Sequence, residues 1–306
     1  MATGLLGQVQ WPNLIAGLAG GAASTLVLHP LDLAKVRMQV NEGTGAVSYR
    51  PKTRGMFKTL FEVARMRGMR GLYLGLTPNL IGSSGSWGLY FLFYGALKSF
   101  CQDADPTRRL STLTYLGCGA LGGSLTLTIM NPMFVIKTRL CLQYECLARD
   151  PSLPGATTWN ALSKLWRYEG VAGLYRGYLA GLLSVSHGAI QFMLYEQMRN
   201  LYNHHYRHRT VNSKLTALEY LTFASLSKLA AASLTYPYQV IRSRMQDEHR
   251  RYKGILDVIR VLWRGEGVRG FYKGLVPNLL RVTPACAITF LVYEYTLDFL
   301  RISSPV

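Results

Sequence analysis

The sequence predicts an all-helical membrane protein that consists of three tandem copies of a two-helix unit. Two observations lead to this prediction. Long stretches with almost no charge recur along the chain, and a pair of short signatures follows them three times in the same order. Of the 306 residues, 49% are hydrophobic and only 16% are charged, which is unlike an ordinary soluble domain.

Six stretches are long enough to cross a bilayer, which takes about 20 mostly apolar residues. Two contain no formal charge, and the others contain one or two ionisable side chains each. In chain order they are residues 13–31, 76–97, 113–136, 177–195, 215–241 and 275–293. An even number of spans places both termini on one side. Because the first ten residues contain no Lys or Arg, we expect neither a secretory signal nor a transit peptide, and we expect any targeting information inside the chain.

The first signature lies near the ends of the first, third and fifth stretches. It reads HPLDLAKVR at 29–37, NPMFVIKTR at 131–139 and YPYQVIRSR at 236–244, with its prolines roughly one hundred residues apart. Proline removes a helix hydrogen bond, so we expect a kink in each copy. The basic residues that follow could simply anchor the helix at the membrane surface. Their recurrence beside a proline in all three copies favours a part in the mechanism instead.

The second signature follows each first one and reads RGMRGLYLG at 67–75, EGVAGLYRG at 169–177 and EGVRGFYKG at 266–274. Between the signatures, apolar residues recur at helical spacing among basic ones, which predicts a short amphipathic helix lying in the headgroup region. The apolar positions are Phe57, Leu60 and Ala64, then Trp159, Leu162 and Trp166, then Leu256, Ile259 and Trp263. The glycines of the second signature offer backbone N–H groups near helix starts, where phosphate binds well.

The charge balance and the cysteines limit the function classes. An excess of 34 Lys and Arg over 16 Asp and Glu gives a net charge of +18, which suits nucleic acid, an anionic membrane surface or anionic ligands. Since the basic residues lie mainly in loops between apolar stretches, we do not expect nucleic acid. Five cysteines without a CxxC pair predict neither a disulfide framework nor a metal site. No nucleophile–base pair or phosphate loop is apparent, so we expect no enzyme and no cofactor.

The two repeated signatures resemble those of the mitochondrial carrier family over about residues 11–301. The resemblance implies one domain over 1–306, with repeats at 11–103, 104–208 and 209–301. It implies six tilted transmembrane helices around a pseudo-threefold axis, three short matrix-side amphipathic helices and a cavity that opens alternately to each side. It further implies a monomer in the mitochondrial inner membrane, with both termini toward the intermembrane space. Cardiolipin is expected at Gly68, Gly75, Gly170, Gly177, Gly267 and Gly274.

Within the family, several segments are most similar to the folate/FAD carrier branch: SWGLYF at 86–91, SHGAIQFMLYE at 186–196 and RVTPACAITFLVYE at 281–294. This similarity implies alternating-access transport of folate (tetrahydrofolate) or FAD, with FAD as a substrate rather than a prosthetic group. An NAD or pyrimidine-nucleotide carrier is the alternative within transport. A membrane scaffold or receptor is the alternative outside it.

In the family, the acidic residue of each first signature pairs with a basic residue of the next copy and closes the matrix side. Asp32 is the one acidic residue at these positions, so the resemblance implies one ion pair, with Lys137. Gln239 is expected to hydrogen-bond Lys35, while Arg242 faces a phenylalanine, and two glutamines match the family's bracing position. The expected matrix gate comprises Asp32, Lys137, Lys35, Gln239, Arg242, Gln39 and Gln246.

The opposite gate of the family carries an aromatic–acidic–x–x–basic motif, which reads YGALK at 94–98, YEQMR at 195–199 and YEYTL at 293–297. Only Glu294 and Lys98 remain as a full pair. One pair on each side implies low barriers to opening, with hydrogen bonds and aromatic packing sharing in closure. The expected cytoplasmic gate comprises Lys98, Glu294, Tyr94, Tyr195, Glu196, Arg199 and Tyr293.

A substrate without threefold symmetry should be recognised where the copies differ. Arg281 is an unaccompanied charge in an apolar span, which makes it a functional candidate whose planar fork can hold a carboxylate or phosphate. Its alternative role is to partner a buried carbonyl. Lys228 stands where the other copies have Gly21 and Gly123, which suggests a second anion-binding point or a side chain that reaches to water.

Weaker candidates surround these two cations. Trp87 and Tyr90 could stack on a flat ring or could pack against helices and lipid. His187 could donate hydrogen bonds to a ligand or join two helices, and Ser184 and Gln191 are polar groups at the same level. Together the set suits an anionic small molecule with an aromatic part.

Overall fold

The computed structural model describes residues 11–41, 55–102, 111–143, 157–205, 216–248, 250 and 252–302, and the first ten residues lie outside this part. Within it, the secondary structure is helical, with no strand. The long helices are α2 (Trp11–Val40), α4 (Leu76–Cys101), α5 (Thr112–Cys141), α8 (Tyr178–His205), α9 (Ala217–Leu234) and α13 (Leu275–Ile302). The shorter ones are α3 (Met56–Gly71), α7 (Thr158–Leu174), α10 (Tyr236–Gln246), α11 (Ile255–Glu266) and α12 (Val268–Phe271).

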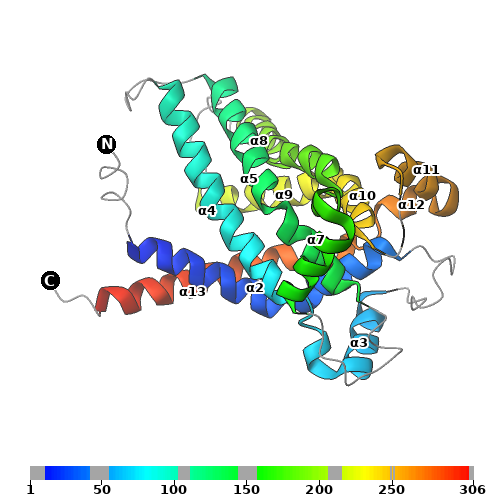
Figure 1. The fold of residues 1–306 in the computed structure, drawn as a ribbon. Coiled ribbons are helices and arrows are strands. Elements are labelled where there is room, and N and C mark those ends of the chain that lie inside the picture. The colour runs from blue at the N-terminus through cyan, green and yellow to red at the C-terminus, as the bar shows by residue number, and fades with distance from the viewer. Residues whose placement is uncertain are drawn as a thin grey trace.

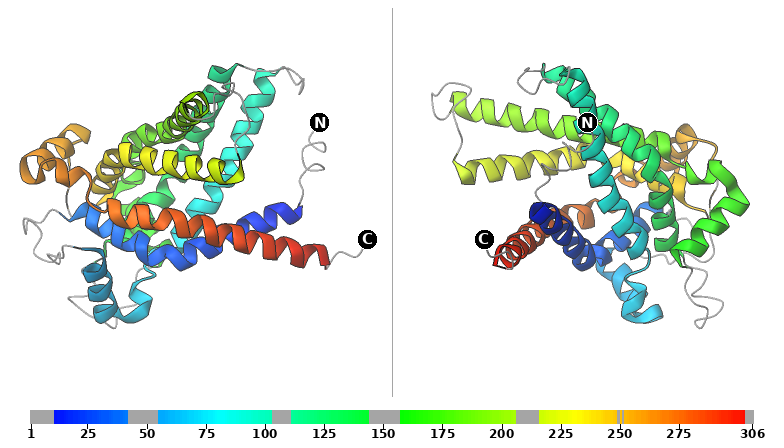
Figure 2. Two further views of the ribbon diagram at one scale, coloured as in Figure 1. Left: turned by 180° about the vertical axis from the view of Figure 1, so that it is seen from behind. Right: turned by 60° about the vertical axis from the view of Figure 1, so that its left-hand side comes forward.

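The long helices lie in three pairs, α2 with α13, α4 with α5, and α8 with α9. The pairs converge near α10 and diverge toward the opposite end, as the two views of Figure 2 show. Small residues allow close approach within a pair. A Cβ on Gly20 of α2 would lie 2.6 Å from the carbonyl oxygen of Thr289 in α13, and one on Gly122 of α5 would lie 3.3 Å from the backbone nitrogen of Tyr94 in α4.

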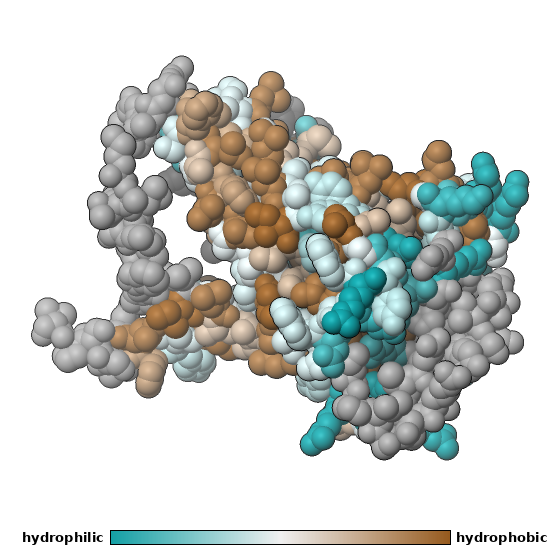
Figure 3. Space-filling model, in the orientation of Figure 1, coloured by the Kyte–Doolittle hydropathy of each residue, from teal (hydrophilic) through white to brown (hydrophobic). Residues whose placement is uncertain are grey.

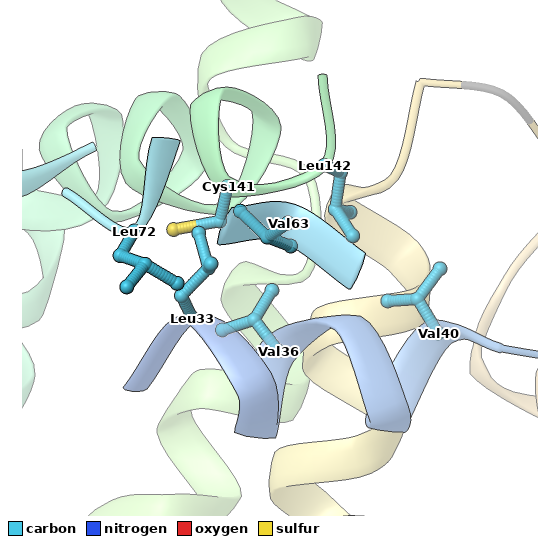
Figure 4. Close-up of a cluster of buried hydrophobic side chains, with 7 residues drawn as sticks. All are labelled: Leu33, Val36, Val40, Val63, Leu72, Cys141 and Leu142. Atoms are coloured by element: carbon cyan, nitrogen blue, oxygen red, sulfur yellow. The ribbon is translucent and has the colours of Figure 1, made fainter. Parts of the chain in front are cut away.

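The buried apolar core lies at the converging end, where α3, α7 and α11 pack beside the long helices (Figure 1). One cluster combines Leu33 and Val36 of α2 with Val63 of α3 and with Cys141 and Leu142 at the end of α5 (Figure 4). The cluster therefore connects the first copy to the second.

The predicted amphipathic helices are present as α3, α7 and α11, but their apolar residues face two ways. Leu60, Leu162 and Ile259 pack against the core clusters. Phe57 and Trp159 are 78% and 74% exposed, so they point away from the protein. Hydrophobic residues cover much of the long-helix surface, and hydrophilic ones gather at the converging end (Figure 3).

On length and composition alone, two described helical segments are apolar enough to cross a membrane, Leu113–Cys141 and Val268–Leu300.

The expected proline kink interrupts the helix in the third copy, where Thr235 separates α9 from α10 and Pro237 opens α10. Pro30 and Pro132 instead lie inside the continuous helices α2 and α5. The copies therefore share the proline but not the break.

A cyclic set of contacts joins the three copies. Gly75, Gly177 and Gly274 all have positive φ, at 79°, 72° and 83°. A Cβ on Gly75 would lie 3.1 Å from the carbonyl oxygen of Lys137, one on Gly177 would lie 3.1 Å from that of Arg242, and one on Gly274 would lie 2.9 Å from that of Lys35. The second signature of each copy thus abuts the first signature of the next copy, and the third returns to the first.

Arginines repeat the same cycle. Arg37 donates from Nε to the carbonyl of Cys141 at 2.9 Å, Arg139 to that of Gln246 at 3.4 Å, and Arg244 to that of Gln39 at 3.0 Å. Each bond runs from one copy to the next. The same step between copies is thus made three times, and the third step returns to the first copy.

We expect Gly274→Ala to destabilise the protein, because the new Cβ would meet the Lys35 carbonyl and because a left-handed backbone strains any L side chain by about 1–3 kcal/mol. Thermal unfolding of the purified protein in detergent measures the effect. Gly95→Ala in α4 is the matched control, since no atom lies within 4 Å of a Cβ there. Equal melting temperatures for the two variants would contradict the proposed packing.

Candidate functional site

The candidate site centres on Asp32 of α2, whose side chain is 3% exposed. Lys137 of α5 approaches Oδ2 to 3.6 Å, and Arg281 of α13 approaches Oδ1 to 3.1 Å. Asn79 of α4 donates a hydrogen bond to Oδ2 at 3.2 Å. A buried carboxylate needs such partners to offset its desolvation. Asp32 therefore brings four helices, α2, α4, α5 and α13, to one point.

The ion pair between Asp32 and Arg281 corrects the expectation that Arg281 is unpaired. Sequence reasoning placed Arg281 alone because its own span holds no other charge. The partner comes from α2, which packs along α13 for most of its length. The guanidinium remains one-third exposed, so it is paired without being enclosed.

The other two junctions between copies use different chemistry. Lys35 donates to Gln239 at 2.9 Å and to Asn278 at 2.8 Å. The Arg242 guanidinium lies over the Phe134 ring, 5.0 Å from its centroid. The contacts expected from the aligned signatures are therefore present as an ion pair, a hydrogen bond and a cation–π contact. Their action as a gate stays a prediction.

Sequence reasoning missed the asparagines Asn79 and Asn278. Both follow a proline shortly after the second signature, in LGLTPNL at 74–80 and KGLVPNL at 273–279. That shared motif was the available signal. The second copy has Gly181 at this position, and a Cβ there would lie 3.4 Å from the Arg242 guanidinium carbon. The glycine thus leaves the room that Arg242 occupies.

The two expected bracing glutamines bond to groups other than the gate pairs. Gln39 donates to the Tyr236 hydroxyl at 3.0 Å and accepts from Ser243 at 2.7 Å. Gln246 accepts from Thr138 at 2.7 Å. Both glutamines therefore join neighbouring copies beside the pairs they were expected to brace.

In the second and third copies, a glutamate forms an ion pair with the second basic residue of the first signature. Glu169 accepts from Arg139 at 2.9 and 2.8 Å and lies 3.2 Å from Arg176. Glu266 accepts from Arg244 at 2.8 and 3.0 Å and lies 2.8 Å from Lys273. The first copy has Arg67 at the glutamate position, so it does not repeat this arrangement.

Among the expected substrate residues, the Lys228 ammonium lies 3.8 Å from the Cys286 sulfur of α13. Within the described residues it contacts no carboxylate, unlike Arg281. His187 Nδ1 lies 3.0 Å from the Thr235 hydroxyl, which joins α8 to the end of α9. Ser184 donates to the carbonyl of Ala180 in its own helix at 3.2 Å. Of the two cations expected to bind substrate, Lys228 is therefore the one without a carboxylate partner in the described structure.

The expected aromatic pair divides between two environments. Trp87 is 63% exposed and stacks on Phe91, with ring centroids 5.7 Å apart. Tyr90 stacks on Tyr94 at 5.9 Å, and a Cβ on Gly119 of α5 would lie 3.4 Å from its hydroxyl. Tyr90 therefore takes part in the packing of α4 on α5, and Gln191 of α8 is half-buried.

The pair expected at the opposite gate is not formed in the described structure. The Lys98 ammonium lies 5.8 Å from the Tyr115 ring centroid instead, and Glu294 is exposed. Tyr195 packs on Tyr220, with centroids 5.7 Å apart. The remaining members are half-buried Tyr94, Arg199 and Tyr293 and exposed Glu196. This end of the molecule is the one at which the helix pairs diverge.

Three similar repeats whose polar residues meet at one level define a class of transport protein, the three-repeat membrane carrier. The family model described as mitochondrial carrier protein matches residues 8–105, 108–206 and 213–304. The chain belongs to this family, and the resemblance inferred from the signatures is confirmed.

Known members extend the comparison. The chain is 40% identical to folate transporter 1, chloroplastic, of Arabidopsis thaliana, over 95% of this chain and 96% of the relative. It is 35% identical to nicotinamide adenine dinucleotide transporter 1, chloroplastic, of the same plant, over 96% and 93%. It is 33% identical to the mitochondrial FAD carrier protein FLX1 of Saccharomyces cerevisiae, over 93% and 97%.

We expect Glu266→Ala to cost about 3–5 kcal/mol of stability, because Arg244, 1% exposed, would keep a buried charge without its carboxylate. Glu248→Ala is the control, since Glu248 is 36% exposed and lies 3.7 Å from Arg139, where a pair contributes about 0–1 kcal/mol. Denaturation in detergent compares the two. Similar losses of stability in the two variants would show that burial of the arginine does not determine the cost of removing its carboxylate partner.

Proposed function

We propose that the protein is an alternating-access carrier that moves folate (tetrahydrofolate) and/or FAD across the mitochondrial inner membrane. The observation that supports this most is the placement of two cations, Arg281 and Lys228, within the mainly apolar helices α13 and α9 of the third copy. Cations in such helices are costly unless they serve a ligand or a partner. Folates and FAD both combine flat rings with anionic groups, which suits these cations together with nearby aromatic and amide side chains.

The names of the relatives support the same substrate class. A folate transporter and an FAD carrier each match this chain over nearly its full length. Transport of NAD is the second candidate, because a nicotinamide adenine dinucleotide transporter matches at 35% identity over a similar span. All three substrates are anionic and aromatic, so the same cations would serve each of them.

The proposed architecture is six tilted spans around a pseudo-threefold axis, with a central cavity. The cyclic glycine and arginine contacts support the threefold relation. The conformation is closed at the converging end, which we assign to the matrix side with α3, α7 and α11, and both termini then face the intermembrane space. The unformed pair of Lys98 and Glu294 suits a carrier open to that space.

In this proposal the matrix gate consists of the three junctions made by Asp32, Lys35 and Arg242. The cytoplasmic gate consists of Lys98, Glu294 and the residues around them at the opposite end of the helices. The substrate lies between them. Its binding residues are Arg281, Lys228, Trp87, Tyr90, His187, Gln191 and Ser184.

Cardiolipin is the proposed lipid partner of the second signature. The first and last glycines of this signature have positive φ in every copy, and Gly75 is the N-terminal cap of α4. The backbone N–H groups at such helix starts suit a phosphate. The carrier is proposed to act as a monomer, without prosthetic group, metal, nucleic acid or enzymatic step.

The decisive experiment is uptake into liposomes that contain the purified protein, with and without internal substrate. We expect saturable uptake of labelled tetrahydrofolate or FAD, with weaker uptake of NAD and pyrimidine nucleotides. Uptake of NAD alone would favour the second candidate. If none of these solutes enters, the assignment as a carrier for this class is wrong.

Lys228→Ala should weaken apparent substrate affinity by roughly ten- to a hundredfold, the loss expected for one hydrogen bond to a charged group. Lys58→Ala, which removes an exposed lysine of α3, should leave uptake unchanged. Lys228→Arg should restore part of the affinity. Normal uptake by Lys228→Ala would exclude this residue from the site.

A further inference from the structure

We infer that Cys101 and Cys118 form a reversible disulfide that fastens α4 to α5 at the diverging end of the molecule. Their sulfurs lie 3.8 Å apart across the two helices, and both are free thiols. Cys101 belongs to the segment matched to the first repeat and Cys118 to the segment matched to the second. The site is therefore a covalent link between two repeats, and it involves none of the residues proposed to bind substrate or to form the gates.

Neighbouring contacts hold the two cysteines at the same level. Three residues before each cysteine, the ammonium of Lys98 lies 5.8 Å from the ring centroid of Tyr115. The turns of α4 and α5 that carry the thiols are thus joined by a second contact. The sulfurs meet because of how these two helices pack, since 17 positions separate the cysteines along the chain.

The helices are close enough for the bond to form without a shift of the backbone. One turn beyond Cys118, a Cβ on Gly122 would lie 3.3 Å from the backbone nitrogen of Tyr94 in α4. A disulfide needs a sulfur–sulfur distance of about 2.0 Å. From 3.8 Å, rotation of the cysteine side chains can close the remaining gap.

The other described cysteines are placed differently. Cys141 is fully buried in the core cluster at the converging end, where its thiol donates to the carbonyl of Leu74 at 3.3 Å. Cys286 of α13 is exposed and lies 3.8 Å from the ammonium of Lys228. Among the described residues, Cys101 and Cys118 are therefore the cysteines that are in contact with each other.

The chemistry balances with hydrogen peroxide as the oxidant. Half-buried Cys101 is the accessible thiol, and its oxidation to the sulfenic acid releases one molecule of water. Cys118, which is 4% exposed, then attacks the Cys101 sulfur, and the sulfenic oxygen leaves as a second water. In total, two thiols lose two electrons and two protons, one S–S bond forms, and the peroxide is reduced.

The position of the bond determines what it restrains. It lies inside one packed pair of helices, α4 with α5, whereas the three pairs separate from one another at this end (Figure 2). The disulfide therefore limits the unfolded chain and the opening of this pair, and it leaves the spacing between pairs free. We expect the oxidised protein to be more stable and to transport normally.

The first test treats the purified protein in detergent with hydrogen peroxide, alkylates the remaining thiols and maps the peptides by mass spectrometry. The Cys101 and Cys118 peptides should be linked, with a mass two hydrogens below their sum, and dithiothreitol should separate them. The melting temperature should rise by about 5 °C on oxidation, as expected for a bond that closes a loop of this length, and should fall back after reduction.

Matched variants separate this pair from other thiol chemistry. Cys101→Ser should show neither the linked peptide nor the rise in melting temperature. Cys286→Ser, which removes an exposed thiol that could join two molecules, should show both. Absence of the linked peptide in the unmutated protein overturns the site. A linked protein with an unchanged melting temperature overturns the stabilisation.

The second test measures uptake after reconstitution, and only this part rests on the proposed function. Oxidised and reduced protein should take up tetrahydrofolate or FAD at the same rate. Loss of uptake on oxidation, with recovery in dithiothreitol, would show that α4 and α5 must separate during transport and would overturn the expected effect. If neither form takes up any substrate, the proposed function is wrong, while the linked peptide and the melting temperature still decide the disulfide.

Discussion

The burial of one carboxylate, that of Asp32, constrains much of this structure. A carboxylate that is 3% exposed must be compensated, and the compensation comes from α4, α5 and α13 at once. These three helices come from the first, second and third copies of the repeat, respectively. The position of a single charge thus ties together parts of the chain that are far apart in sequence, and it does so at the level where the copies meet.

Around Asp32, the backbone contacts between copies repeat, whereas the side-chain contacts between copies differ. The backbone contacts are cyclic: a glycine of positive φ in each copy abuts a carbonyl of the next, and an arginine bridges the same step. The side chains at the junctions are not equivalent, since they form an ion pair, a neutral hydrogen bond and a cation–π contact. The backbone contacts are therefore equivalent between the copies, while the side-chain contacts distinguish one junction from another.

Much of the candidate site followed from the resemblance to the family, in which the acidic position of each first signature pairs with the basic position of the next copy. That reasoning identified the contacts of Asp32 with Lys137, of Gln239 with Lys35, and of Arg242 with Phe134. It failed for Asn79 and Asn278, which lie outside both signatures. It failed again for Arg281, whose partner is in a helix 249 positions earlier in the chain. Pairings between α2 and α13 depend on how the chain closes into a ring.

The sequence by itself determined the repeat, the helical elements and the family, because periodic hydrophobicity, proline and glycine act locally and recur in each copy. It also determined which side chains are available at each junction. Only the tertiary structure decided which cation stays exposed, which amides complete the junctions, and that the pair at one end is formed while Lys98 and Glu294 stay apart. These properties depend on distances between helices from different copies, and no local pattern in a single chain encodes such distances.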